Sequence, residues 1–196
     1  MNPADYEWKP VEVLPDGRLR LHVIYLEMRQ RPKQAPPPPP DLHVHLMQAV
    51  RPTVSFYRYL YHTVGEPWLW STYHRVGDEA LRTILHDANT EVHVLYADGV
   101  PAGYAHLDFR GMPDVELLFF GLIPEFIGRR LGPVLLHHAI ERVWDRGATR
   151  FWLHTCSGDH PKAVSVYRRA GFVPYRTETR IIDDPRPHRR PEPDHA

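Results

Sequence analysis

The glycine turn in the stretch PEFIGRRLGPVLLHHAI, residues 124–140, is well suited to hold an anion. An apolar strand over 114–123 is predicted to run into a helix through Gly128 and Gly132. The first amides of a helix have no partner inside it, and they lie at the positive end of the helix dipole. Glycine also lets the main chain approach a ligand closely. The pattern predicts a phosphate-binding turn, and an ordinary strand–helix connection is the alternative.

Arg130 lies between the two glycines and decides how a phosphate would fit. The turn lacks the lysine of a Walker loop, and the G-x-G-x-x-G spacing of a dinucleotide fingerprint is absent. An arginine side chain there either crowds the phosphate or pairs with it through its guanidinium. We expect the helix to begin at Arg130 or Leu131 with ordinary helical dihedrals, so that Arg129 and Arg130 help to bind the phosphate.

The bulk composition limits the partners that the chain is expected to have. Its 196 residues suffice for one domain, and its 24 Lys and Arg balance its 24 Asp and Glu. This balance gives no electrostatic reason to expect a nucleic-acid or membrane partner. A single cysteine, Cys156, fits a reducing compartment. With no secretory signal and no apolar run of ~20 residues, we expect a cytoplasmic protein.

The periodicity of apolar residues predicts strands mixed with helices, and therefore one α/β domain with a mixed sheet. A stiff proline-rich connector with five consecutive prolines at 36–40 follows the first strand. Asp78 is the expected cap of the second helix, and Asp98-Gly99 the expected turn of a hairpin. The predicted strands are 19–28, 92–96, 102–106, 114–123, 149–155 and 172–182, and the predicted helices are 53–64, 78–86, 130–147 and 160–171.

Together these features resemble the GNAT superfamily of acyl-CoA-dependent N-acyltransferases. Gly128 to Gly132 match the end of the family's R/Q-x-x-G-x-G/A loop, with Arg130 where a glycine is common. The family's Y-x-x-x-G-F motif is matched by Tyr167, Gly171 and Phe172. The resemblance implies a three-layer fold with a mixed, mostly antiparallel central sheet flanked by helices. It also implies acetyl transfer from acetyl-CoA to an amine by direct attack, without a metal.

Composition and the resemblance together suggest four segments along the chain. Residues 1–30 form an N-terminal strand segment, 31–41 a proline-rich connector, 42–182 the acyltransferase domain and 183–196 a disordered tail. The motifs that carry the resemblance fall within 91–180. Many members of the family form homodimers, so the resemblance leaves both a monomer and a homodimer open.

The resemblance also assigns roles to particular residues. Glu116 would accept a proton from the amine, and Tyr167 would donate one to the leaving thiolate. Aromatic side chains around the first helices would hold the amine. The residues expected to bind coenzyme A are Phe120, Leu122, Ile123, Ile127, Gly128, Arg129, Arg130, Leu131 and Gly132, and those expected to bind the acceptor are Tyr57, Trp68, Trp70 and Tyr73.

Each role has a structural alternative. Glu116 could be a solvated strand end, Tyr167 a core aromatic, and the aromatic cluster a core or dimer contact. The histidine pairs 43/45 and 137/138 lack a third ligand, so we expect no metal site. Structural roles are favoured for His154 and His160, and Cys156 is expected to be inert.

Two other functions stay open. One is an acyl-CoA-binding protein without turnover, because Arg130 and the uncertain base leave catalysis in question. The other is an interaction protein whose prolines at 36–40 bind a partner.

Overall fold

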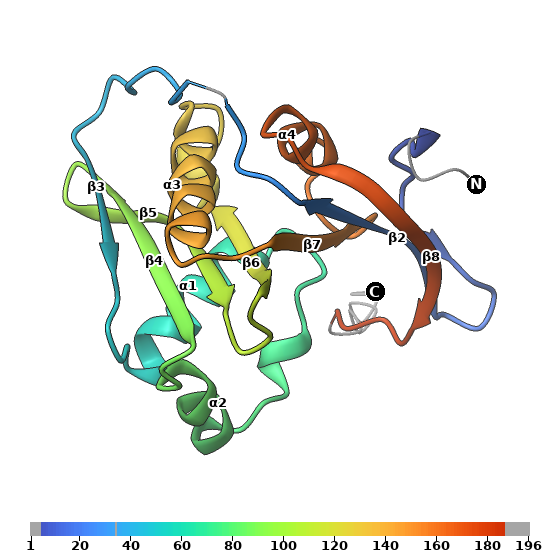
Figure 1. The fold of residues 1–196 in the computed structure, drawn as a ribbon. Helices are drawn as coiled ribbons and strands as arrows, with labels where there is room; N and C mark the ends of the chain where they lie inside the picture. Colours follow the sequence, from blue (N-terminus) through green and yellow to red (C-terminus); the bar gives the residue numbers. More distant parts are fainter. Residues whose placement is uncertain (1–4, 34, 187–196) are drawn as a thin grey trace.

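A single eight-stranded sheet organises the computed structural model, which describes residues 5–33 and 35–186 (Figure 1). The strands lie in the order β1-β2-β7-β6-β5-β4-β3, and β8 pairs with β2. All the pairings are antiparallel except β6–β7. The strands are β1 Glu12–Val13, β2 Leu19–Met28, β3 Val44–Gln48, β4 Thr90–Ala97, β5 Val100–Asp108, β6 Asp114–Leu122, β7 Arg150–Cys156 and β8 Val173–Ile182.

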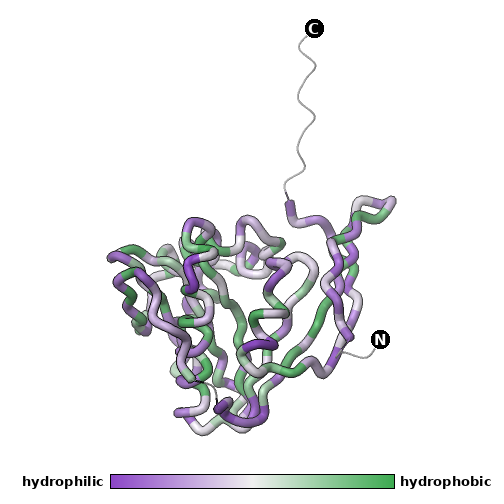
Figure 2. Tube along the Cα trace, turned by 90° about the horizontal axis from the view of Figure 1, so that it is seen from above, coloured by the Kyte–Doolittle hydropathy of each residue, from purple (hydrophilic) through white to green (hydrophobic). Residues whose placement is uncertain are grey.

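Helices cover both faces of this sheet, so the predicted three-layer fold is confirmed (Figure 1). One hydrophobic cluster packs α3 and α4 against the sheet, and a second packs α1 and α2 against the other face. Figure 2 shows hydrophobic residues along the inner strands and hydrophilic residues on many outer turns. The helices are α1 Val54–Gly65, α2 Asp78–Leu85, α3 Leu131–Asp145 and α4 Ala163–Arg169.

Local signals account for several element boundaries. Thr53 caps α1, because its side chain accepts a hydrogen bond from the amide of Phe56. Asp98 and Gly99 have positive φ values of 49° and 88° and form the two-residue turn between β4 and β5, as predicted. The cap expected at Asp78 is wrong, because Gly77 precedes α2 and the Asp78 carboxylate pairs with the guanidinium of Arg58.

Two strands have no counterpart among the sequence predictions. β3 pairs with β4 and extends the predicted three-strand meander to four strands. β1 pairs with two residues of β2. The strand predicted at 19–28 is confirmed as β2, which lies between β7 and β8 and so joins the N-terminal segment to the main sheet.

Strands β6 and β7 separate part of the way along their length, and the candidate site lies at this separation. These two parallel strands pair only from Asp114–Arg150 to Glu116–Trp152. Leu117 pairs with Leu107 of β5 but Phe119 with His106, so Leu118 is an extra residue that forms a bulge in β6. Beyond Glu116 the main chain of β6 therefore has no strand partner on its β7 side.

Candidate active site

A cleft of about 590 Å³ occupies the opening between β6 and β7. Its walls come from β6, β7, the α1–α2 connection, the turn before α3, the loop before α4, and the facing residues of β2 and β8. The cleft is large enough for an extended small ligand.

Phe120 and Leu122 of β6, both expected to bind coenzyme A, line this cleft. Ile123 does not, because it is 4% exposed and packs in the cluster beneath α1 and α2. Gly121 lets α1 approach the strand closely, because a Cβ at this position would lie 2.4 Å from Cγ1 of Val64. The unpaired edge of β6 is thus the floor of the cleft.

The glycine turn lies at one end of the cleft and has an unusual backbone. Gly128 has a φ of 87°, and Arg130 is left-handed with φ 61° and ψ 13°. The expectation that Arg130 has ordinary helical dihedrals is therefore wrong, because α3 begins at Leu131 and Arg130 is its N-cap residue. No hydrogen bond from the amides of Gly128, Arg129 or Arg130 is found within the described part of the chain. Alternating backbone handedness is typical of anion-binding nests.

The other side chains of the turn differ in their surroundings. Ile127 is 41% exposed and lines the cleft, as do Arg130 and Gly132. Leu131 is fully buried in the core, so that only its main chain could reach a ligand. The guanidinium of Arg129 lies over the ring of Phe126, 5.5 Å from its centroid.

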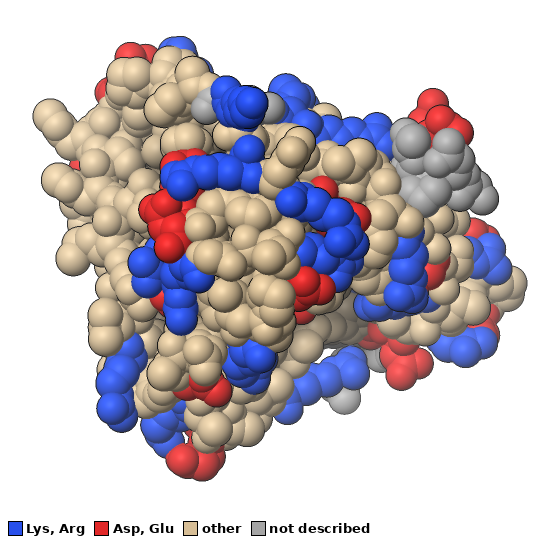
Figure 3. All heavy atoms as spheres, in the orientation of Figure 1, with Lys and Arg blue, Asp and Glu red and all other residues tan. Residues whose placement is uncertain are grey.

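Basic side chains dominate the charge of the cleft wall. Arg130, Lys162, Arg169 and Arg180 line it. Asp159 is the one carboxylate found among the described residues of the lining. Figure 3 shows acidic and basic side chains interspersed over the face that it presents. The excess of positive charge is thus local to the cleft, and the neutral net charge of the chain did not reveal it.

Tyr167 lies on α4 and lines the cleft while its ring packs in the core. Only 7% of the residue is exposed, and its ring centroid lies 5.9 Å from that of Phe120. Burial, together with the charge of Asp159, raises the pKa of the Tyr167 hydroxyl far above its usual value. The hydroxyl is therefore protonated at neutral pH, as a proton donor must be.

Glu116 lies at the last position at which β6 pairs with β7, and it is outside the lining of the cleft. Its Oε1 is 3.5 Å from Nδ1 of His154 on β7. His154 does line the cleft. The structure thus brings Glu116, the predicted proton acceptor, close to His154, for which the sequence favoured a structural role.

The aromatic residues expected to bind the acceptor divide into two groups. Tyr57 is fully buried, and its hydroxyl is 2.8 Å from Nδ1 of His106. Tyr73 is 9% exposed and belongs to the cluster beneath α1 and α2, where burial raises its pKa to about 12. Trp68 and Trp70 line the cleft.

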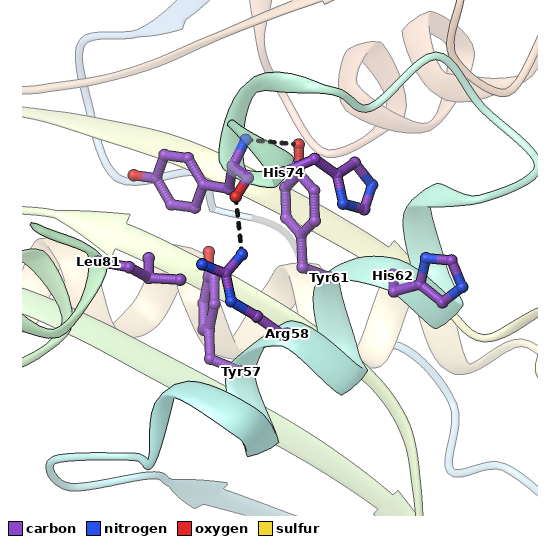
Figure 4. A pocket seen from close by; sticks show the side chains of 7 residues that line it. Tyr57, Arg58, Tyr61, His62, His74 and Leu81 are labelled. Atoms are coloured by element: carbon purple, nitrogen blue, oxygen red, sulfur yellow. Dashed lines mark hydrogen bonds between the residues drawn. The ribbon is translucent and has the colours of Figure 1, made fainter. Parts of the chain in front are cut away.

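A second, smaller pocket of about 230 Å³ adjoins the cleft and shares Tyr61 with it (Figure 4). Arg58 holds its rim together by donating hydrogen bonds to the main-chain oxygens of Tyr73 and Val76. The amide of Tyr73 in turn donates a hydrogen bond to the hydroxyl of Tyr61. These contacts fix the connection between α1 and α2 against helix α1.

Asp159 organises the cleft wall and was absent from the sequence predictions. Its Oδ2 accepts hydrogen bonds from the Thr155 hydroxyl and the Cys156 amide, and its Oδ1 accepts one from Nε1 of Trp70. The centroid of the Trp68 ring lies 5.1 Å from that of His160. The polar neighbours of Asp159 in the segment TCSGDH could have suggested a loop. Nothing local in the sequence indicates that Asp159 contacts Trp70.

Three further features concern the cysteine thiol, metal ligation and membrane spanning among the described residues. Burial, with the charge of Asp159, raises the pKa of the Cys156 thiol to about 12, which disfavours the nucleophilic thiolate. Among residues 5–33 and 35–186, no group of three His, Cys, Asp or Glu side chains is arranged to hold a metal ion. No helix in the same ranges is both long and apolar enough to cross a bilayer.

Solved structures share this architecture. A GCN5-related N-acetyltransferase from Sphaerobacter thermophilus aligns with a TM-score of 0.60 and 17% identity, over 92% of this chain and 54% of that chain. Another from Kribbella flavida aligns with a TM-score of 0.56 and 20% identity, over 85% of this chain and 59% of that chain. At these identities the likeness establishes the fold, which is that of N-acetyltransferases.

The sequence itself gives the family. The model of the acetyltransferase (GNAT) family matches residues 53–172, more than half of the chain. The chain therefore belongs to the GNAT acetyltransferase family, and the family prediction is confirmed.

Two curated relatives match part of the chain. A mycothiol acetyltransferase from Acidothermus cellulolyticus is 39% identical over 75 residues, 37% of this chain and 20% of that protein. A streptothricin acetyltransferase from Streptomyces lavendulae is 32% identical over 83 residues, 39% of this chain and 41% of that protein. The alignments therefore span less than half the length of each of these relatives.

Proposed function

We propose that this protein is an N-acetyltransferase that moves an acetyl group from acetyl-CoA to an amine by direct attack. The observation that carries the proposal is the cleft between β6 and β7, which has a nest-like turn at one end and an unpaired strand edge along its floor. Membership of the GNAT family supplies the class of reaction.

The donor would bind in two parts. The amides at 128–132 and the cationic side chains near them would hold the pyrophosphate of the donor. The pantetheine arm would hydrogen-bond to the free edge of β6, as an added strand does. Phe120 and Leu122 would contact it there, while Leu131 and Ile123 would contribute through the main chain or through packing.

The chemistry then needs three protein contributions. A main-chain amide of β6 would stabilise the oxyanion that forms when the amine attacks the thioester carbonyl. The pair formed by Glu116 and His154 would remove the proton from the amine. Tyr167, which lines the cleft, would protonate the departing thiolate.

The acceptor would be an amine of a small molecule, a peptide or a protein. Trp68 and Trp70 would offer ring faces to it. Tyr57 would contribute only indirectly, by supporting His106 beneath this wall. The names of the two curated relatives support acetyl transfer, and their short alignments leave the choice of acceptor to experiment.

Several further expectations belong to this proposal. The enzyme would act in the cytoplasm, without a metal and without nucleic-acid or membrane partners, as a monomer or a homodimer. The acyltransferase domain would span 42–182, with 31–41 as a connector. Of the proposed tail at 183–196, the residues from 187 onward lie outside the described residues.

The first experiment is calorimetric titration of the full chain with acetyl-CoA and with free coenzyme A. Micromolar binding followed by amine-dependent thiol release is the expected result. Binding without thiol release for any amine in a broad panel would instead favour an acyl-CoA-binding protein. Absence of binding by either ligand would overturn the donor site.

A substitution in the turn tests where the phosphate binds. Gly128→Glu should abolish binding of acetyl-CoA, because it places a carboxylate beside the pyrophosphate. Gly128→Gln is the matched control, since it imposes the same backbone strain at φ 87° without the charge. Undiminished affinity in a folded Gly128→Glu protein would show that the phosphate binds elsewhere.

A further inference from the structure

Glu116 and His154 face each other across the point at which β6 and β7 separate. Glu116 is opposite Trp152, the last register pair of the two strands, and His154 follows Trp152 by two residues. Residues two apart on a strand share a face, so the imidazole lies on the same face as Trp152 and one step further into the opening. The distance from Nδ1 of His154 to Oε1 of Glu116 is 3.5 Å.

The two side chains differ in their access to the cleft. His154 lines the cleft and its side chain is 39% exposed, whereas Glu116 lies outside the lining and its side chain is 19% exposed. The ring nitrogen Nδ1 is the one that faces the carboxylate. Nε2, on the opposite side of the ring, is therefore the nitrogen left to meet a ligand.

We propose that Nε2 of His154 takes the proton from the acceptor amine, and that Glu116 is a positioning residue that holds the imidazole through Nδ1. This inference rests on the proposed function and identifies the base within it. A carboxylate next to Nδ1 selects the tautomer with Nε2 free to accept, and it stabilises the imidazolium that forms. The 3.5 Å separation has to shorten by a few tenths of an ångström, as catalytic hydrogen bonds do when a substrate binds.

The proton balance is complete without any further reagent. Nε2 takes one proton from the ammonium form of the acceptor, and the neutral nitrogen forms a bond to the thioester carbonyl carbon. The carbon–sulfur bond then breaks, and the thiolate takes the proton of the Tyr167 hydroxyl. The nitrogen loses its second proton, which restores Tyr167, and His154 releases its proton to water. The products are the acetamide, free coenzyme A and one proton.

Several titratable or charged groups surround this imidazole. Tyr25 on β2 packs against it, with ring centroids 5.6 Å apart. The Tyr25 hydroxyl donates a hydrogen bond to Glu178 and accepts one from Arg180, both on β8, and Arg176 lies over the Tyr25 ring. Cys156 shares the strand, and Tyr73 is close enough to Glu116 to feel its charge. Of these groups, Glu116 is the one within ion-pair distance of the ring.

The test is the pH dependence of kcat/KM for wild type, His154→Gln and Glu116→Gln, with acetyl-CoA and an amine found by thiol-release screening. Wild type should show an acidic limb of one proton, because Nε2 can accept a proton only from the neutral imidazole. His154→Gln should lose about a hundredfold or more in kcat/KM, together with this limb. Glu116→Gln should keep the limb and lower kcat/KM by less than His154→Gln does, because the imidazole is still present but is no longer held through Nδ1.

Two controls separate catalysis from folding. His160→Gln changes the other histidine of the cleft lining and should keep the acidic limb. Added imidazole should restore part of the rate of His154→Ala. Each variant should bind acetyl-CoA as wild type does.

The outcomes distinguish this inference from the proposed function. If wild type transfers acetyl groups and His154→Gln keeps both the rate and the limb, the inference is wrong and the proposed function stands. If wild type neither binds acetyl-CoA nor releases thiol, both fail.

Discussion

Nε1 of Trp70 donates a 2.9 Å hydrogen bond to Oδ1 of Asp159, which joins the α1–α2 connection to the loop after β7. Beside it, the amide of Leu69 donates to the main-chain oxygen of Gly158, and the Leu69 side chain lies against that glycine. Both loops line the cleft. Their contacts therefore form a bridge between these two parts of its wall, with Asp159 as its polar centre.

Replacing Asp159 should loosen this bridge and destabilise the fold. Asp159→Ala leaves three donors without their acceptor, among them the buried hydroxyl of Thr155. We expect a loss of about 3 kcal/mol in the free energy of unfolding, measured by urea titration. The amide of Leu69 should also exchange its hydrogen faster.

The control for this variant removes one of the three donors. Thr155→Val keeps the size of the side chain and deletes one hydrogen bond, so about 1 kcal/mol should be lost. Equal losses for the two variants would contradict the central role of Asp159.

Arg130 holds a backbone conformation that glycine adopts more easily. Its φ of 61° costs a non-glycine residue about 1 kcal/mol. Its ion pair with Asp41 joins two exposed side chains and contributes little. Arg130→Gly should therefore raise the free energy of unfolding by roughly 0.5–1 kcal/mol, as measured by urea titration.

The same variant should bind acetyl-CoA more weakly, by about tenfold, because it loses a guanidinium next to the phosphates. Calorimetry measures this change. Arg130→Ala separates the two effects, since it removes the charge but keeps a Cβ. If Arg130→Gly bound more tightly than wild type, the arginine would be an obstacle to the phosphate.

Features encoded by neighbouring residues could be predicted from the sequence. The Asp98-Gly99 turn and the α1 cap at Thr53 each depend on a few consecutive residues and their own main chain. The turn at 128–132 was placed correctly, yet the conformation of Arg130 was not. Arginine favours helix by local propensity, whereas here it is left-handed at the position that precedes α3.

Contacts between distant segments could not be predicted in this way. Trp70 and Asp159 are 89 residues apart, and the short strand β3 is recognisable only by its pairing with β4. The proximity of His154 to Glu116 depends on the parallel register of β6 and β7, which no local pattern records. For His154, one half of the proposed proton-accepting pair, the sequence therefore favoured a structural role over proton transfer.

Tyr167 provides a direct test of the proposed proton donor. Tyr167→Phe should lower kcat by about a hundredfold or more and leave the affinity for acetyl-CoA within about twofold, because the ring still packs against Phe120. Thiol-release assays measure kcat, and calorimetry measures the affinity for acetyl-CoA. As a control, an acetyl thioester with a better leaving group should partly restore the rate of this variant. An unchanged rate would assign Tyr167 to packing alone.

A buried histidine, His106, and a half-buried one, His138, should make the fold sensitive to acid. Burial lowers the pKa of His106 to about 3, and burial together with the charge of His93 lowers that of His138 to about 4. In the unfolded chain both titrate at about 6.5. Below that pH the unfolded state binds more protons, so the free energy of unfolding should fall as the pH falls from about 6.5 to 4.

For each of these histidines the expected slope rises from about 0.7 kcal/mol per pH unit at pH 6.5 toward about 1.4 near pH 5, which urea titrations over this range would measure. His138→Gln should remove one of the two contributions, although it also deletes the hydrogen bond to His93 and lowers the stability at every pH. His45→Gln, on the exposed side of β3, is the matched control and should leave the slope unchanged. A His138→Gln protein with the wild-type slope would show that His138 takes up its proton without unfolding, by turning its ring out of the contact with His93.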